Sequence, residues 1–197
     1  LGGGLAAPDA LYVFVAGFIG GGVVLGGTLQ HGGRGNAGAI GSMPMAETGP
    51  DGRPRQLIHD ASLVTLETAL RAAGVDPVAV IAGERVDPAA EAAFDAWAAV
   101  AARGLARAVA AAASVFDFEA VVIDGALNRA WLGRLIARAR EDLRGLDLSG
   151  LSPLRIAQGA VGPDARVLGA AILPLHARFS PQPQLLARTP PLHSTAA

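Results

Sequence analysis

The sequence predicts a mixed α/β domain in which at least two strands of the sheet run parallel. Strand-like runs lie close together near the start of the chain, and helical patterns then alternate with short buried strands. About half of the 197 residues are apolar and only 17% are charged, which is typical of a well-buried globule. A helix that connects two strands of one sheet makes those strands parallel, so this order of elements indicates a mixed sheet.

The first strands surround a turn rich in glycine. Residues 11–16 are dense in β-forming side chains, a second strand is expected over residues 21–25, and a third begins at Thr28. Residues 17–20 suit a tight hairpin turn whose glycines need positive φ. They also suit a backbone that a phosphate approaches without meeting a Cβ atom. Spacing alone favours the plain turn.

A second glycine-rich segment, residues 31–41, follows these strands. Its backbone amides could meet the hydroxyls of a sugar, or the segment could be a flexible connection without a ligand. Composition alone favours the connection. Residues 56–73 then show apolar side chains at helical spacing, and Gly74 is a suitable end for this helix.

The longest predicted helix follows Asp87 and Pro88, which read as an N-cap and the first helical position. It covers the alanine-rich residues 89–115. Strands are then expected at residues 118–123 and 154–157, and helices at residues 129–143 and 165–177. Residues 181–197 are expected to form an extended or disordered tail.

The turn after the buried strand, residues 124–128, is a further candidate for chemistry. A buried strand that runs into a glycine-containing turn and then a helix is the usual nucleotide crevice of an open α/β sheet. A plain turn explains the residues equally well. Asp124 suits a helix cap as well as a ligand contact.

Charge and cysteine content argue against several classes of protein. The net charge of −1 gives no electrostatic footprint for nucleic acid, so any contact with DNA would need a segment outside this chain. The chain has no cysteine, and its four histidines lack ligand spacing, which argues against a zinc site. Residues 10–30 carry no charge, but their glycines and short β-branched runs favour strands over a membrane span. We therefore expect a cytoplasmic protein, and no general base can be named from spacing.

Four segments, taken in order, resemble the ROK family (repressor, open reading frame, kinase) over about residues 11–179. Residues 17–29 resemble the Gly-x-Gly-Ile-Gly-x-Gly run of that family, and residues 32–41 its following G-x-x-G-x-A-G-E-I-G-H block. Residues 121–127 resemble its late i-v-i-G-G-g-l turn, and residues 167–171 its closing v-G-A-A helix.

The resemblance implies an actin-like ATPase, ribonuclease H-like fold, in which residues 1–180 form the C-terminal lobe of a sugar kinase-like protein. It implies ATP with magnesium as cofactor, a sugar or sugar derivative as ligand, and a homodimer. It also implies seven binding positions. Gly20 and Gly21 would lie near the phosphates, and Gly125 and Ala126 near the adenosine. Asn36, Gly38 and Ala39 would lie near the sugar.

Departures from the family pattern bear on function. The family's sugar-binding Glu is Ala39 here, and the His that serves its zinc site is Ser42. The cysteines of that zinc site are missing, so no zinc is expected. An alanine cannot accept hydrogen bonds from a sugar, so affinity for an ordinary hexose should fall by a few kcal/mol unless another group replaces it. The family's catalytic Asp, in an N-D-x-N motif, would precede Leu1, and we expect this chain to be a piece of a longer protein.

Because a sensor tolerates such losses better than an enzyme does, we favour the sugar-sensing lobe of a ROK transcriptional regulator, which would bind DNA through an upstream segment. One alternative is an ATP-dependent sugar kinase of divergent specificity, of the glucokinase or amino-sugar kinase type. The other is a nucleotide-free structural or dimerisation domain.

Overall fold

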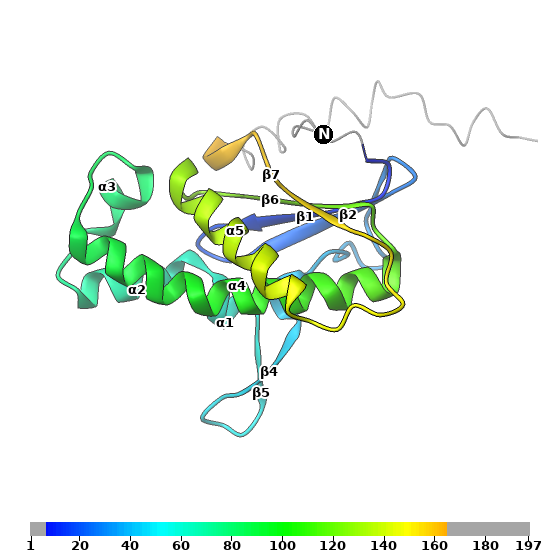
Figure 1. The fold of residues 1–197 in the computed structure, drawn as a ribbon, viewed down its shortest axis with the longest axis horizontal. Helices are drawn as coiled ribbons and strands as arrows, with labels where there is room; N and C mark the ends of the chain where they lie inside the picture. Colours follow the sequence, from blue (N-terminus) through cyan, green and yellow to red (C-terminus); the bar gives the residue numbers. More distant parts are fainter. Residues whose placement is uncertain (1–6, 165–197) are drawn as a thin grey trace, which may run out of the picture. The chain divides into compact units, whose positions relative to one another are not determined.

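A five-stranded mixed sheet lies at the centre of residues 7–164, the part of the chain that the structure, a computed structural model, describes (Figure 1). The strand order is β3-β2-β1-β6-β7. The first three strands form an antiparallel meander, and β1, β6 and β7 run parallel to one another. The predicted mixed sheet is confirmed. The strands are β1 (Ala10–Val15), β2 (Gly20–Leu25), β3 (Thr28–Gln30), β6 (Ala120–Gly125) and β7 (Arg155–Gln158).

The described residues also contain five α-helices and two short 3₁₀ helices. The α-helices are α1 (Ile58–Ala61), α2 (Leu63–Ala72), α3 (Pro77–Ala82), α4 (Pro88–Phe116) and α5 (Arg129–Arg144), and the 3₁₀ helices are η1 (Ile40–Ser42) and η2 (Gly162–Asp164). The helices α4 and α5 pack against each other, and α5 also contacts β6 and β7. Alternate side chains of β1, namely Leu11, Val13 and Val15, are buried in this core.

The long helix α4 begins as predicted. The Asp87 carboxylate accepts hydrogen bonds from the backbone N–H groups of Ala89 and Ala90 at 2.9 and 3.3 Å, and Pro88 is the first helical residue. By length and composition alone α4 could cross a membrane, but half of its apolar window is buried in this fold. We therefore assign α4 as the core helix of the domain.

The single helix predicted over residues 56–73 is broken into α1 and α2 at Ser62. Ser62 has an extended backbone (φ −82°, ψ 150°) and is buried. The break frees the first N–H groups of α2, and those of Leu63 and Val64 donate to the carbonyls of Ala16 and Gly17 at 2.7 and 3.4 Å. The start of α2 is thus bonded to the chain just after β1, a long-range contact that helical spacing does not reveal.

A short hairpin and the helix α3 were not predicted. Strands β4 (Pro44–Thr48) and β5 (Pro54–Gln56) form a separate hairpin that projects away from the main sheet (Figure 1). Helix α3 is capped by Asp76, whose side chain accepts from the N–H of Val78, and it ends at Gly83 with φ +82°. The Asp76-Pro77 pair is the same start signal that identified α4. The predicted helix at residues 165–177, the v-G-A-A segment and the tail lie outside the described residues.

A buried carboxylate on α1 predicts a pH dependence of stability. Asp60 is 6% exposed, and its Oδ1 lies 2.8 Å from the Arg55 guanidinium. Burial raises the pKa of Asp60, although Arg55 acts in the opposite direction. The folded state therefore binds a proton on the Asp60 carboxyl group more tightly than the unfolded chain does. The stability that this proton binding contributes is present below the ordinary carboxyl pKa and is lost as the pH rises through the raised pKa of the folded state.

We accordingly expect the Asp60→Asn variant to gain stability relative to wild type as the pH rises from about 4 towards neutrality. Urea unfolding of both proteins at several pH values measures this difference. A difference that stays constant, or that changes in the opposite direction, would contradict the assignment.

Candidate functional site

A pocket of about 340 Å³ forms where the two glycine-rich segments meet. One wall is the β1–β2 turn and the start of β2. The other wall is the loop that leads into η1, with Ile58 of α1 at its edge. The volume lies in the range of small-molecule sites. We call it the glycine pocket, lined by Ile19, Gly20, Gly21, Gly35, Asn36, Ala37, Gly38, Ala39, Gly41, Ser42 and Ile58.

Glycine contacts hold the two walls together. A Cβ atom on Gly38 would lie 2.7 Å from the Cα of Gly22 and 2.8 Å from the carbonyl oxygen of Gly21, and one on Gly21 would lie 3.0 Å from the carbonyl oxygen of Gly38. A Cβ atom on Gly41 would collide with the carbonyl oxygen of Ile19. The loop is thus packed onto β2 at distances that only glycine permits. Composition favoured a flexible connection here, but residues 38 and 41 of the segment pack closely against β2 and the β1–β2 turn.

The glycines of the β1–β2 turn do not serve the role that a plain turn would give them. Positive φ occurs at Gly26 and Gly27, between β2 and β3, and not at Gly17, Gly20 or Gly21. The strand β3 pairs only with residues 23–25 of β2, so the glycine half of β2 has no strand on that side. An unpaired strand edge presents backbone N–H and C=O groups. Here that edge faces the loop and the glycine pocket.

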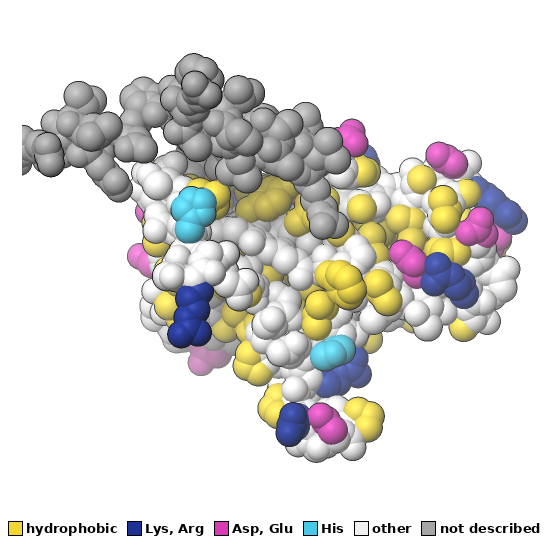
Figure 2. All heavy atoms as spheres, turned by 180° about the vertical axis from the view of Figure 1, so that it is seen from behind, with side chains coloured by type: hydrophobic (Ala, Val, Ile, Leu, Met, Phe, Trp, Pro, Cys, Tyr) yellow, Lys and Arg dark blue, Asp and Glu magenta, His cyan; other side chains and the backbone are white. Residues whose placement is uncertain are grey.

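Recognition in this pocket would depend mainly on backbone groups. Asn36 and Ser42 supply its only amide and hydroxyl side chains, and no residue that lines it is charged. Ala39, which replaces the family's Glu, is exposed at the wall. Seen from behind, the middle of the molecule shows mostly backbone and apolar side chains, with charged side chains at the projecting hairpin and at both ends (Figure 2).

The other predicted nucleotide residues, Gly125 and Ala126, do not line the glycine pocket. Gly125 ends β6 and Ala126 follows it, and both contact the carboxyl end of β1. The N–H of Ala126 donates to the carbonyl of Val15 at 2.9 Å, and a Cβ atom on Gly125 would collide with the same carbonyl oxygen. Because the β1–β2 turn leaves from this end of β1, both predicted nucleotide segments lie at the same end of the sheet.

Asp124 caps no helix. The cap of α5 is Asn128, whose side chain accepts from the N–H of Trp131 at 2.9 Å. The Asp124 side chain is fully buried and accepts a hydrogen bond of 3.2 Å from the Tyr12 hydroxyl. Burial, together with this carboxylate, raises the pKa of the Tyr12 hydroxyl, so the phenol stays protonated and donates.

Several residues of the site have no signal in the sequence. Ile58, at the start of α1, lines the pocket although the nearest other lining residue in the sequence is Ser42, 16 residues earlier. The partners of Asp124 come from β1 and from the turn after β7, although one charged residue inside the apolar run of β6 was a signal that could have been used. Within residues 7–164, no three His, Asp or Glu side chains come together to hold a metal ion.

Comparisons with known proteins agree with this fold. The sequence model of the ROK family matches residues 2–176. The bifunctional enzyme NanE/NanK of Brucella melitensis is 34% identical over 179 residues, covering 87% of this chain and 32% of that protein. The chain therefore spans about a third of the length of this curated relative.

Solved structures share the architecture. A ROK hexokinase from Thermus thermophilus superposes with a TM-score of 0.61 and 29% identity, covering 90% of this chain and 61% of that one. A ROK family glucokinase from Streptomyces griseus, in complex with glucose and AMPPNP, gives a TM-score of 0.65 and 21% identity, covering 86% and 61%. Structures with this fold include a transcriptional regulator as well as kinases. The predicted actin-like ATPase fold is confirmed, and the chain belongs to the ROK family.

Proposed function

We propose that this chain is the C-terminal lobe of an ATP-dependent sugar kinase that phosphorylates a hexose or an amino sugar. One observation carries the proposal. The residues assigned by resemblance to phosphates and to sugar, Gly20–Gly21 and Asn36–Ala39, line the same pocket, and those assigned to adenosine adjoin the same end of β1. Transfer of a phosphoryl group needs both reactants side by side, whereas sensing a sugar needs only the sugar subsite.

The backbone of the pocket suits the phosphates of ATP. Gly20 has no heavy atom within 4 Å of where a Cβ atom would stand, so a phosphate could approach its backbone without a side chain in the way. No carboxylate lines the pocket. These residues therefore do not fit a magnesium site, and magnesium has no part in what we derive for this chain.

The described residues would position the reactants and leave proton transfer to another part of the protein. When bound, ATP supplies the phosphoryl group: the sugar oxygen bonds to the γ-phosphorus, the bond from that phosphorus to the β–γ bridging oxygen breaks, and the hydroxyl proton goes to a base. The pocket contains no Asp, Glu or His to act as that base. By resemblance it is the Asp expected upstream of Leu1. The loop and the β2 edge would orient the sugar and the phosphates.

The regulator favoured by the sequence analysis stays the second candidate. It is supported by Ala39 and Ser42, which place neither a carboxylate nor an imidazole at the pocket wall. A sensor can use a weakly binding sugar, because it need not hold a hydroxyl in line for attack. A homodimer, a cytoplasmic location and contact with DNA through a segment outside this chain stay predictions.

The release of ADP by the full-length protein tests the proposal, with ATP, magnesium and a panel of hexoses, pentoses and amino sugars. Turnover on one of these sugars supports a kinase and identifies its substrate class. If no sugar is phosphorylated while one of them raises the melting temperature, the sensor is supported instead. Failure to bind ATP and every sugar would leave a structural or dimerisation domain.

Restoring a carboxylate at the pocket wall should increase sugar affinity. Ala39 is exposed and borders the pocket, so the Ala39→Glu variant can place an acceptor there. Because hydrogen bonds to a charged group contribute about 1.5–3 kcal/mol, we expect the Kd for glucose to fall by about tenfold or more. Calorimetric titration measures it, with Ala39→Gln as the neutral control of equal length. Equal affinity in both variants would show that position 39 does not face the sugar.

A further inference from the structure

Asp124 is the only fully buried charged side chain among residues 7–164, and its surroundings are unusual for a structural carboxylate. It stands on β6, between β1 and β7 in the sheet, one residue before the strand ends. The family's i-v-i-G-G-g-l turn has a glycine at this position. The side chain lies next to Gly125 and Ala126, where the resemblance places adenosine. A buried carboxylate is costly unless every lone pair finds a donor, so its contacts need an explanation.

Those contacts come from all three parallel strands or from the segments next to them. From the middle of β1, the Tyr12 hydroxyl donates to Oδ2 at 3.2 Å, and at the end of β6 the Gly125 N–H donates to Oδ1 at 2.9 Å. From the turn after β7, the N–H groups of Val161 and Gly162 donate to Oδ2 at 3.1 and 3.0 Å. One side chain thus connects β1, the β6 turn and the segment after β7.

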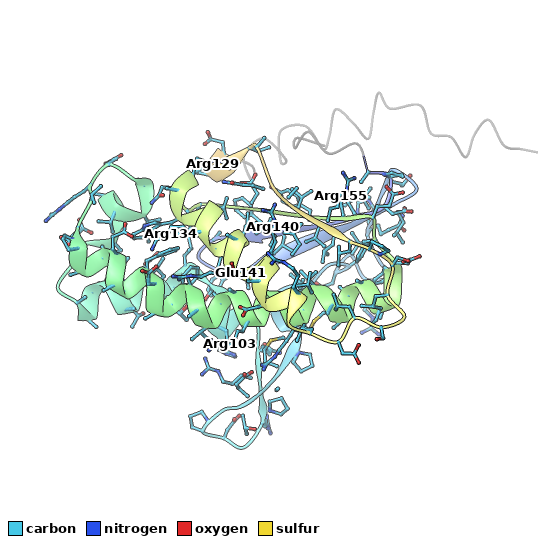
Figure 3. The ribbon with its side chains drawn as sticks, viewed as in Figure 1. Arg103, Arg129, Arg134, Arg140, Glu141 and Arg155 are labelled. Atoms are coloured by element: carbon cyan, nitrogen blue, oxygen red, sulfur yellow. The ribbon has the colours of Figure 1, made fainter. Side chains whose placement is uncertain are left out.

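The turn after β7 is built around this carboxylate. Consecutive backbone N–H groups that converge on one anion form an anion-binding nest, and Gly162 has the positive φ (+70°) that such a turn uses. A Cβ atom on Gly159 would occupy the place of the Asp124 side chain, so that position has room only for glycine. The Arg129 guanidinium, at the start of α5 (Figure 3), donates to the carbonyl of Gly159 at 2.6 Å and also lies 3.5 Å from Oδ1 of Asp124, so it contacts both the turn and the carboxylate.

We propose that Asp124 is a positioning residue for nucleotide binding, which holds the turn of residues 159–162 next to the carboxyl ends of β6 and β7. In open α/β sheets, ligands bind outside the carboxyl ends of the strands. The turn has few other attachments to the sheet: the N–H of Gly159 bonds to the carbonyl of Ile123 at 2.8 Å, and the nest holds residues 161 and 162. The inference rests on the proposed function, because it places the nucleotide at this end of the sheet.

The requirement is for a carboxylate and not only for its shape. Tyr12, Gly125, Val161 and Gly162 all donate to Asp124, so both of its oxygens must accept. An asparagine has the same size, but it replaces one oxygen with an NH₂ group that would face donors in either orientation. The Asp124→Asn variant should therefore loosen the turn while it leaves the volume of the core unchanged.

The experiment compares ADP and sugar binding by the full-length wild type and the Asp124→Asn variant, using calorimetry. The sugar is the one that most raises the melting temperature of the wild type. We expect the Kd for ADP to rise by about tenfold or more and the Kd for the sugar to change less than about twofold. Hydrogen exchange of the Val161 and Gly162 amides should become faster in the variant. The matched control is Glu119→Gln, an exposed carboxylate just before the other end of β6, which should change neither affinity.

The outcomes separate this inference from the proposed function. Unchanged ADP affinity in Asp124→Asn, or an equal loss of ADP and sugar affinity, would overturn the positioning role alone. If the wild type binds no ADP, both the proposed function and the inference fail. If Asp124→Asn does not fold, Tyr12→Phe removes one donor without burying a new group, and it should still weaken ADP more than the sugar. Equal effects on the two ligands would then overturn the inference.

Discussion

Replacing Gly38 by alanine is expected to abolish ligand binding in the glycine pocket and to cost about 2–4 kcal/mol of stability. Two penalties act at this position. Its φ of +82° lies in the left-handed region, and its Cβ atom would stand 2.7–2.8 Å from backbone atoms of Gly21 and Gly22. Backbone atoms in a paired strand cannot move aside as a flexible side chain can. The loop must therefore lift off β2, which opens the wall shared by the two predicted subsites.

The matched control for this variant is Gly27→Ala, in the turn between β2 and β3 and outside the pocket. Gly27 also has a positive φ (+71°), but no heavy atom lies within 4 Å of where its Cβ would stand. This variant should lose only about 1–2 kcal/mol of stability, from the unfavourable backbone conformation, and should still bind the ligand. Urea unfolding and calorimetric titration measure both quantities. Similar losses in the two variants would show that the contact with β2 does not hold the pocket together.

Replacing Phe94 by alanine should destabilise the fold by about 3–5 kcal/mol. Phe94 is fully buried between α4 and α5, where its ring stacks on Trp131 with centroids 4.5 Å apart and lies 6.0 Å from the ring of Trp97. The Arg134 guanidinium covers it at 4.7 Å from the ring centroid. Alanine would leave a cavity among rigid rings that cannot collapse around it, and it would remove the cation–π contact.

Phe18→Ala is the control, because it removes the same ring from a position that is 71% exposed. Its effect on the free energy of unfolding should stay within about 0.5 kcal/mol. Urea denaturation of the two variants and of wild type provides the comparison. A loss below about 1 kcal/mol for Phe94→Ala would mean that the helix pair α4–α5 is held by other contacts.

Local rules predicted most elements of this fold. The β-branched run of β1 and the Asp87-Pro88 start of α4 depend on neighbours in sequence, and both elements begin within one residue of the expected position. The break at Ser62 was not predictable in this way, since it is stabilised by carbonyls of Ala16 and Gly17, more than 40 residues away. The hairpin β4–β5 has few apolar residues and thus gives no periodic signal.

In the candidate site, too, some features were predictable from local sequence and others were not. Its glycine positions could be identified from the sequence, because the order of the glycine segments along the chain resembles the ROK pattern even where individual residues differ. The reason for each glycine could not be predicted: Gly20 and Gly21 were consistent with a turn of positive φ, yet their φ is not positive. A Cβ atom on Gly21 would instead lie 2.6 Å from the carbonyl oxygen of Tyr12 on β1 and 3.0 Å from that of Gly38. A close approach between two backbones is a property of two segments, and neither segment encodes it alone.

By itself, then, the sequence determined the mixed α/β class, the family and the positions of the glycine segments, because propensity, capping and motif order are local properties of the chain. Only the tertiary structure decided that the loop of residues 31–41 packs to form a pocket, and that Asp124 joins β1, β6 and the turn after β7. Those contacts connect residues up to 112 positions apart, and their energies depend on which backbones the fold brings within hydrogen-bonding distance.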